Sequence, residues 1–360
     1  MRLRLLVFIR GVFAATAILV LSGCYAGYLM RAAYEGGRIL WNRKPISTEL
    51  ASTDLSKETR DKLETILAVR KFAADDLGLN VGGAYETIAP VHESAIIHVV
   101  MAAPRNSLAP YTWWFPIVGS VPYRGYFEES HAVDEARYLE DQGLDTMVRP
   151  AVAFSSLGFF DDPVLSNMLK VDRVELAGVI IHELFHRTYY LASDAMFDES
   201  AATYVGNAGA IAFFTKTEGA ASEDAKSARD VLESDMMFAD FLEQSEAALL
   251  RIYMLNIPID DILKQRQVAF AQIQANYAKL EPSLSGLERF DLDKEPLNNA
   301  VLVNYLLYFH DLKNFAKLNQ QNNNDLRATI AQIISLAKAH EEDPFYAIWQ
   351  ATHPAPTASH

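Results

Sequence analysis

The sequence predicts an α+β fold: a small mixed sheet, then helices that carry the chemically active residues, then a mainly α-helical C-terminal lobe. Between residues 85 and 155, segments rich in β-branched and aromatic residues are interrupted by Gly and Pro, a pattern that is typical of strands. From about residue 171 onward, apolar residues recur at three- and four-residue spacing, which is typical of amphipathic helices. Half of the 360 residues are apolar, so the chain can bury a sizeable core and is not a disordered or fibrous protein.

The N-terminal segment has the composition of a targeting sequence. Three arginines within the first ten residues precede an uncharged apolar stretch over 11–21, which is the layout of a secretory signal. The stretch ends in Leu-Ser-Gly followed by Cys24, a pattern that resembles the bacterial lipobox, in which cleavage leaves a cysteine to be acylated. Cys24 is also the single cysteine of the sequence. We therefore expect a lipoprotein signal peptide over 1–23; a transmembrane anchor with a chance cysteine and a buried core thiol are the alternatives.

Acylation of Cys24 is expected to anchor the chain in the bacterial cell envelope. Because Tyr25 rather than Asp follows the cysteine, the lipobox resemblance implies the outer membrane, with the protein facing the periplasm. Residues 24–47 are predicted to form the acylated N-terminus and a tether helix. The amphipathic pattern of this segment suits a helix on the membrane surface as well as a helix packed on the protein body.

The remaining residues, 48–360, are predicted to form a single domain. It begins with a helical pattern over 48–80, with Thr53 or Asp54 as the N-cap and Gly78 as the stop. Strands are expected within 94–104, 112–127 and 146–156, and a helix over 128–143 precedes the last of them. Later helices are expected over 238–253, 259–277 and 297–318, followed by a polar loop over 319–324.

The segment with the strongest chemical signal is an HExxH pattern, which runs from His182 to His186. In a helix, residues four positions apart lie on one face, so the two imidazoles can converge on one Zn²⁺ at ~2.0–2.1 Å. Glu183 lies about 100° further round the helix and can reach a metal-bound water without binding the metal. The neighbouring residues are apolar, and a buried helix carries such polar groups only when a metal or a partner compensates them. The alternative is a buried helix whose histidines make ordinary hydrogen bonds.

A catalytic zinc site needs a third protein ligand. Ala192 occupies the position six residues after His186, which excludes a third His at that spacing. Glu199 is favoured, because the next predicted helix carries Glu199 on the same face as small residues that permit close packing on the first helix. Asp198 is the competing ligand, and Asp194 is expected as an N-cap or loop acid. The alternative for Glu199 is a charge that interacts favourably with the helix dipole.

The layout resembles the gluzincin metallopeptidases, although only 12 residues separate His186 from Glu199 and Arg187 follows the second His. A closer resemblance rests on five ordered blocks: the lipobox, TWWFPIVGSVPYRGYF, AFSSLGFFDDPVLSNML, HELFH with FDESAATYVG, and LNNAVL. Together they resemble a bacterial aminopeptidase family of zinc-dependent, gluzincin-like HExxH lipoproteins. In that family the residue before the third ligand is often Asn, so Asp198 stays open as a ligand or as a partner of a ligand.

The resemblance implies a zincin-like fold and hydrolysis of peptide bonds through a water activated by zinc, with His182, His186 and Glu199 as zinc ligands and Glu183 as general base. A peptide substrate would pair along the edge of the strand within 146–156. The sequence offers several donors for the oxyanion and does not choose among them: Tyr123, Arg124, Tyr126 and Tyr305. Asp161 and Asp162 either anchor a free α-amine or close an Asp-Asp-Pro turn.

The composition excludes several other functions. With 46 acidic against 32 basic residues, the net charge is −14, which argues against a nucleic-acid partner. The sequence contains no nucleophile elbow, P-loop or dinucleotide fingerprint. Two alternatives remain: a non-catalytic envelope lipoprotein scaffold, and a zinc amidohydrolase that acts on a non-peptide or cell-wall amide. The expected partners are a peptide substrate and the membrane, and the sequence does not indicate the oligomeric state.

Overall fold

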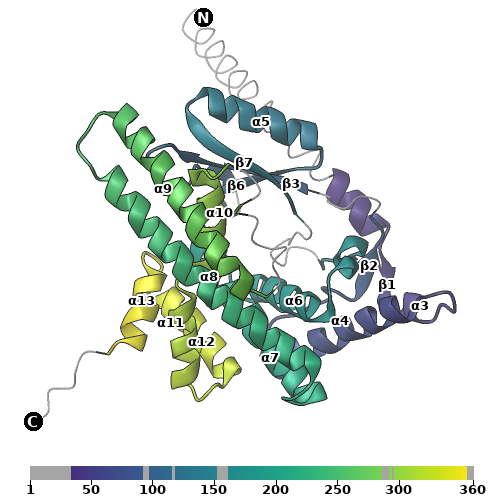
Figure 1. Cartoon of the computed structure of the whole chain (residues 1–360). Helices are drawn as coiled ribbons and strands as arrows, with labels where there is room; N and C mark the ends of the chain where they lie inside the picture. The colour runs from purple at the N-terminus through teal and green to yellow at the C-terminus, as the bar shows by residue number, and fades with distance from the viewer. Residues whose placement is uncertain are drawn as a thin grey trace, which may run out of the picture.

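The described part of the chain is mostly helical, with small sheets between its first helices (Figure 1). The computed structural model describes residues 34–91, 97–115, 118–151, 161–285, 292–293 and 296–354. The predicted signal peptide and Cys24 lie outside these residues. Of the predicted tether, residues 34–41 are helical. This helix buries Ile39 in the main core, whereas Tyr34 and Trp41 are exposed, Trp41 to 89%.

The described strands form three sheets, where the sequence predicts one small mixed sheet. The largest is antiparallel, with β3 (Ile97–Pro104) between β6 (Tyr123–Tyr126) and β7 (Leu144–Ala151). The mixed pairing occurs in a second sheet, formed by β1 (Lys44–Pro45), β2 (Thr87–Ala89) and β8 (Val164–Leu165). The third is the hairpin of β4 (Trp113–Phe115) and β5 (Gly119–Val121). Gly119, at φ 75°, and Pro122 divide the segment over 112–127 into separate short strands.

The β6–β3–β7 sheet separates two cores. Successive side chains of a strand point to opposite faces. Val100 and Ala102 of β3 accordingly pack toward α5 (Glu129–Asp141), the helix predicted before the last strand. Val99 and Met101 belong to the main core on the other face. Figure 1 shows α5 on one side of this sheet and α6 (Arg173–Thr188) on the other. The sheet therefore forms a roof over α6.

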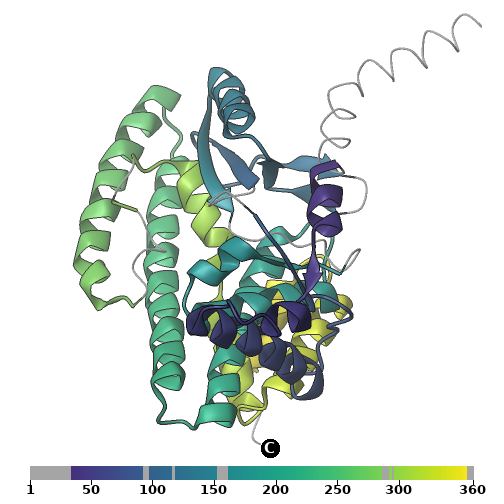
Figure 2. The ribbon, with the colours of Figure 1, turned by 90° about the vertical axis from the view of Figure 1, so that its right-hand side faces the viewer.

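The helices come from most of the chain, and Figure 2 shows the long α8 and α9 standing side by side. Besides α5 and α6, the structure contains α3 (Ile46–Leu50), α4 (Lys57–Asp75), α7 (Ala195–Glu218), α8 (Glu223–Tyr253), α9 (Ile259–Leu280), α10 (Asn299–Phe309), α11 (Leu312–Gln321), α12 (Leu326–Ala339) and α13 (Pro344–Thr352). Short 3₁₀ helices cover η1 (Ser166–Lys170) and η2 (Glu281–Ser283). The N-cap of α4 is Ser56, whose Oγ accepts a hydrogen bond from the Thr59 amide, and neither Thr53 nor Asp54 has this role.

The helix predicted over 297–318 is two helices, α10 and α11. The chain turns at Asp311, which has a left-handed φ of 57°, a conformation that Asp tolerates better than most residues. The Ser200 hydroxyl accepts a hydrogen bond from the His310 amide and donates one to the Leu307 carbonyl. These two backbone groups at the end of α10 therefore have hydrogen-bond partners. Apolar residues continue through the break because both helices are packed on the core, and the sequence pattern therefore does not reveal it.

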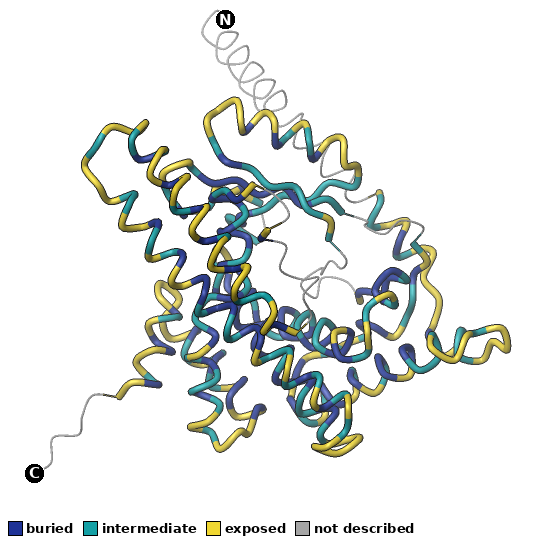
Figure 3. The backbone as a smooth tube through the Cα atoms, viewed as in Figure 1, coloured by how far each residue is buried: buried dark blue, intermediate teal, exposed yellow. Residues whose placement is uncertain are grey.

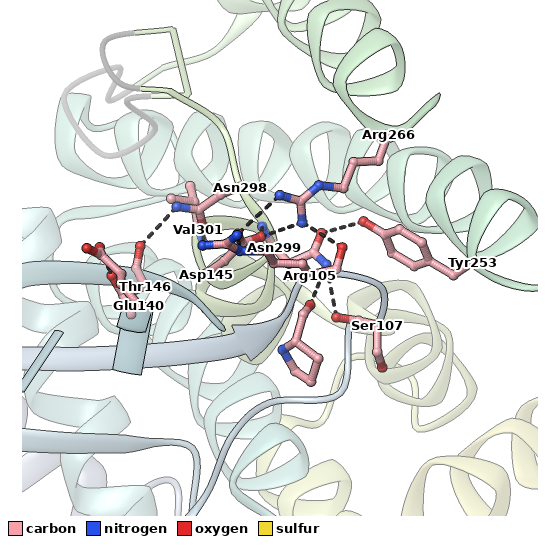
Figure 4. Close-up of polar contacts among 11 residues, drawn as sticks. Arg105, Ser107, Glu140, Asp145, Thr146, Tyr253, Arg266, Asn298, Asn299 and Val301 are labelled. Atoms are coloured by element: carbon pink, nitrogen blue, oxygen red, sulfur yellow. Dashed lines mark hydrogen bonds and ion pairs between the residues drawn. The ribbon is translucent and has the colours of Figure 1, made fainter. Parts of the chain in front are cut away.

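A buried polar network fixes the start of α10 against the sheet (Figure 4). The Asp145 carboxylate on β7 accepts two hydrogen bonds from Arg266 of α9, at 2.6 and 3.1 Å, and one from the Asn299 amide at 3.0 Å. The Asn299 side chain donates to the carbonyls of Pro104 and Ser107 and accepts a 2.6 Å bond from the Tyr253 hydroxyl. The LNNAVL block of the sequence thus joins β7, α8, α9 and α10. Figure 3 shows that α10 is largely buried.

Candidate metal centre

Helix α6 carries the HExxH residues in the predicted arrangement. It begins at its N-cap Asp172, whose Oδ1 accepts a 2.8 Å hydrogen bond from the Glu175 amide. His182 and His186 lie on one face of this helix, with ring centroids 4.7 Å apart and Nε2 atoms 3.1 Å apart. The helix is buried as predicted, because its apolar residues belong to the main core.

Helix α7 brings Glu199 to the two histidines. It begins at Ala195, and Asp194 is its N-cap as expected, with Oδ1 accepting a hydrogen bond from the Phe197 amide. Gly206 on this helix crosses α6 so closely that a Cβ there would lie 2.7 Å from the Gly178 carbonyl oxygen and 3.2 Å from the His182 Cβ. The small-residue face therefore packs on α6, as the sequence predicts, and Glu199 faces the histidine pair.

The close crossing of α6 and α7 leads to a prediction about Gly206 and Gly178, which face each other across it. Gly206→Ala is expected to lower the free energy of unfolding by about 1–3 kcal/mol, because the new methyl group overlaps a backbone carbonyl that cannot move alone. Its displacement of α7 is also expected to weaken metal binding. Gly178→Ala is the matched control, because a Cβ there has no contact closer than 3.6 Å. It is expected to be neutral or to stabilise by up to about 1 kcal/mol. Urea unfolding of both variants tests this, and equal effects would contradict the prediction.

The imidazoles of His182 and His186 and the carboxylate of Glu199 form one group that could hold a metal ion, called here the His-His-Glu group. The Glu199 Oε2 atom lies 3.2 Å from the His182 Nε2 and 3.3 Å from the His186 Nε2. Ligand atoms bound tetrahedrally at ~2.0–2.1 Å are separated by about 3.3 Å, so this group has the size of a zinc site. Asp198 does not join the group, because its Oδ1 accepts a 2.9 Å hydrogen bond from the Leu191 amide.

Without a metal, the His-His-Glu group holds a proton. Burial alone would lower the pKa of His186, but the Glu199 carboxylate beside it raises that pKa to about 9. Burial alone would raise the pKa of Glu199, but the neighbouring His186 and the hydrogen bonds from both histidines hold it well below its usual range. The metal-free site therefore contains an imidazolium paired with a carboxylate at neutral pH, and a metal ion must displace that proton.

We expect the stability of the metal-free protein to fall as the pH rises from about 6.5 to about 9. The pKa of His186 is about 6.5 in the unfolded chain and about 9 in the fold, so its stabilising contribution is complete below pH 6.5 and is lost through pH 9. Burial raises the pKa of Asp198 to about 8, which acts in the same direction. Metal affinity should increase over the same interval, because only neutral imidazole binds metal. Urea unfolding of chelator-treated protein and zinc titrations at several pH values measure both. A metal affinity that is independent of pH would contradict the prediction.

Asp198 lies next to the group in a different role. At this site, the buried Nδ1 of His186 and the buried Oδ2 of Asp198 both lack a hydrogen-bond partner among the described residues. The charge of each residue shifts the pKa of the other, so they are electrostatically coupled. A histidine that binds metal through Nε2 carries its proton on Nδ1 and needs an acceptor there. The Asp198 carboxylate, whose charge raises the pKa of His186, is a candidate for this acceptor.

The His-His-Glu group opens into a cavity of about 1060 Å³. Its floor is α6, including Glu183; its roof is the β6–β3–β7 sheet, and one wall is α10. Tyr123 of β6 donates a 3.4 Å hydrogen bond from its hydroxyl to the Glu199 Oε1. Tyr308 of α10 stacks on the His182 ring at 6.4 Å between centroids. Burial and the charge of Glu199 raise the pKa of Tyr308 well above its ordinary value, so it is a neutral hydrogen-bond donor.

The structure separates the four predicted oxyanion donors. Tyr123 and Tyr305 line the cavity, although Tyr305 packs edge-on against the Phe238 ring at 5.3 Å. Arg124 and Tyr126 point to the opposite face of the sheet, where Arg124 lies 3.6 Å from the Glu135 carboxylate of α5. Strand alternation explains this division, which follows once Tyr123 is placed on the face of the His-His-Glu group.

Sequence reasoning missed three residues of the cavity wall. Arg149 of β7 donates from Nε to the Asn304 Oδ1 at 2.7 Å and from Nη2 to the Tyr308 hydroxyl at 3.1 Å. Asn304 and Tyr308 are four residues apart on α10 and lie on one face of it. The only sequence signal was the run of polar side chains at this spacing inside an otherwise apolar helix.

Asp161 and Asp162 do not line the cavity. Asp161 accepts hydrogen bonds from the Arg187 guanidinium and from the Gly83 amide, both at 3.0 Å. The Asp162 carbonyl accepts from the Tyr85 amide at 2.8 Å. Gly82 has φ 45°, and the Arg187 guanidinium fills the space that a Cβ would occupy there. Arg187, unusual after an HExxH motif, thus ties the end of α6 to this turn.

Among the described residues, no helix combines the length and apolar character that a membrane span requires. No curated protein and no solved structure matches the chain. One family model matches residues 27–345, which cover the sheets, the cavity and the His-His-Glu group, as well as most of the helical part. The predicted resemblance to an aminopeptidase family is confirmed, and the chain belongs to the family described as "Putative aminopeptidase".

Proposed function

We propose that this protein is a zinc-dependent peptidase of the envelope, an aminopeptidase by family, with a zincin-like active site. The observation that carries the proposal is the His-His-Glu group, whose ligand atoms lie 3.1–3.3 Å apart and face a large cavity. Family membership supports a peptide substrate. The mostly helical α+β fold with the group between α6 and α7 agrees with this proposal.

Zinc is the metal that this donor set favours. Two imidazoles and one carboxylate are the ligands of several hydrolytic zinc sites, and they leave a position open for water. Bound there, Zn²⁺ would supply a water acidic enough to attack at neutral pH and would polarise the scissile carbonyl. His182, His186 and Glu199 would hold it, and Asp198 would orient the His186 ring.

Glu183 is the proposed general base. It follows the first ligand on α6, lines the same cavity and does not belong to the His-His-Glu group. Its carboxylate would accept a proton from the attacking water and pass it to the leaving amine. Because one turn of helix fixes the position of Glu183 relative to both histidines, the base is placed by the same element that places the ligands.

Tyr123 and Tyr308 are the proposed donors to the oxyanion of the substrate. Arg149 donates to the Tyr308 oxygen, so the hydroxyl hydrogen of Tyr308 is free to point toward the cavity. Tyr123 approaches from the roof, and its hydroxyl would turn from the Glu199 Oε1 toward the substrate. Strand β7 lies at the edge of its sheet among the described strands, where an extended peptide could pair as the sequence predicts.

A set of free and N-acetylated peptides tests the proposed direction of cleavage. We expect zinc-loaded protein to release N-terminal residues from free peptides, with at least about tenfold lower kcat/KM for the acetylated forms, because the charged α-amine would lose its recognition. Mass spectrometry of the products identifies the bond that is cut. Equal cleavage of both sets would contradict the aminopeptidase assignment, and no cleavage of either would contradict the peptidase assignment.

We also propose that Cys24 is acylated and holds the protein at the outer membrane on its periplasmic side. The lipobox resemblance supports this, and so does the exposed aromatic face of the helix over 34–41, which follows the cysteine within about ten residues. Tyr34 and Trp41 are two helical turns apart and lie on one face, and amphipathic aromatic rings favour the membrane interface. Membrane fractionation of a Cys24→Ser variant is the test: the variant should be released, and retention would contradict acylation as the anchor.

A further inference from the structure

The Arg149 guanidinium faces the cavity and has no acidic partner among the described residues. In the sheet register Arg149 pairs with Val99, which lies opposite Gly125, so these three residues occupy one row on the cavity face of the roof. The guanidinium is held by neutral groups, the Asn304 amide oxygen and the Tyr308 hydroxyl. Neither bond engages Nη1, and no carboxylate of the described chain lies within 4.0 Å of this side chain.

Three other arginines with buried or half-buried side chains are neutralised. Arg266 lies against Asp145, Arg187 against Asp161, and Arg124 near Glu135. The chain carries an excess of 14 negative charges, so acidic partners are abundant. A half-buried cation left with neutral partners beside a catalytic cavity is costly unless a ligand supplies the negative charge. The described structure thus leaves a positive charge in the cavity for a substrate to neutralise.

The position of Arg149 fits a short peptide. The Tyr308 ring lies 6.4 Å from the His182 ring and 5.7 Å from the Arg149 Cζ, so this Cζ is at most about 12 Å from the His182 ring. An extended chain of at most three or four residues spans that distance, at ~3.3–3.6 Å per residue. The planar guanidinium matches a carboxylate, which it can bind through two parallel hydrogen bonds.

We propose that Arg149 binds the carboxylate of the substrate, and that the preferred substrates are short peptides with a free C-terminal carboxylate. The proposal rests on the peptidase function given above and narrows its substrate class to peptides of a few residues. Asn304 is then a positioning residue, because it fixes the Nε edge of the guanidinium and leaves the other edge for the ligand. An acidic side chain near the end of a peptide offers the same chemistry, and the test separates the two sources.

The test measures binding without turnover, in zinc-loaded protein that carries Glu183→Gln. Calorimetric titration with trileucine and with its C-terminal amide gives an affinity ratio. We expect the amide to bind about tenfold more weakly or worse, because it lacks the charge-assisted hydrogen bonds to Arg149. Adding Arg149→Gln should bring the affinity ratio close to one, because this replacement weakens the binding of the free acid only. Arg149→Lys should restore part of the affinity ratio. Asn304→Ala keeps the charge of Arg149 and should retain most of the ratio.

Two outcomes would overturn the proposal: equal affinity for the acid and the amide with Arg149 present, or equal weakening of both by Arg149→Gln, which would make Arg149 a structural support for Tyr308. A third probe, a leucine peptide amide that contains one glutamate, distinguishes the sources. If it binds as tightly as trileucine acid, the side-chain carboxylate is the ligand and the free C-terminus is not, which contradicts the short-peptide preference. Turnover is measured separately with native Glu183. No cleavage there would contradict the peptidase function, whereas the binding ratio would still decide the role of Arg149.

Discussion

Replacement of Glu183 by Gln is expected to lower kcat by about 10²–10⁴-fold, the range that general acid–base catalysis contributes. The amide keeps the size of the carboxylate but cannot accept the proton of the attacking water. The variant should keep one zinc per chain, because Glu183 does not belong to the His-His-Glu group. Peptide turnover and metal content, measured on the same preparation, test both parts of the prediction.

Glu64→Gln is the matched control for this experiment. Glu64 is an exposed residue on α4, so its replacement removes the same charge from the chain without touching the cavity. It should keep full activity and full zinc content. Loss of zinc from the Glu183 variant would make Glu183 a metal ligand and would contradict its role as base. Full activity of that variant would exclude the mechanism, and a wild-type protein without any activity would favour a scaffold.

The sequence correctly predicted which residues come together in the His-His-Glu group where local geometry sets their positions. His182 and His186 follow from one helical turn, and α6 places them together as predicted. The prediction of Glu199 required one further step, the recognition of a second helix with small residues on the face that crosses α6. Gly206 contacts α6 at this face, so the spacing of small residues along α7 was enough to predict the packing of these two neighbouring helices. Asp194 as N-cap is a local feature of the same kind.

The cavity wall could not be predicted because it depends on contacts across the chain. Arg149 and its partners Asn304 and Tyr308 are more than 150 residues apart in sequence and meet only through the packing of α10 on β7. The prediction of a single sheet was wrong for a related reason. A composition rich in β-branched residues identifies strands but does not indicate which strands pair. The break at Asp311 was hidden because core packing maintains the apolar spacing on both sides of it.

The network that joins α10 to the sheet gives the second large effect. Asp145→Ala is expected to lower the free energy of unfolding by about 3–5 kcal/mol, because it leaves the Arg266 charge buried without its partner. The two side chains are only 8% and 6% exposed, so water cannot replace the lost carboxylate. The Asn299 amide loses its acceptor as well, which removes a bond at the first residue of α10. Urea unfolding measures the change, and a control at the exposed pair of Lys57 and Asp61, Asp61→Ala, should cost less than about 1 kcal/mol.

A double replacement separates two effects on the free energy of unfolding: the destabilisation by an unpaired buried charge and the stabilisation by the ion pair. Asp145→Ala combined with Arg266→Met removes both charges and fills part of the volume, so it should recover much of the lost stability. Activity should recover less, because the Asn299 amide would still lack the carboxylate that holds the start of α10. That helix carries Asn304 and Tyr308, whose distance from His182 and Arg149 depends on where it begins. A double variant as unstable as Asp145→Ala alone would show that the stranded charge is not the cause. Recovery of stability and activity together would show that the network serves the fold and does not position the cavity wall.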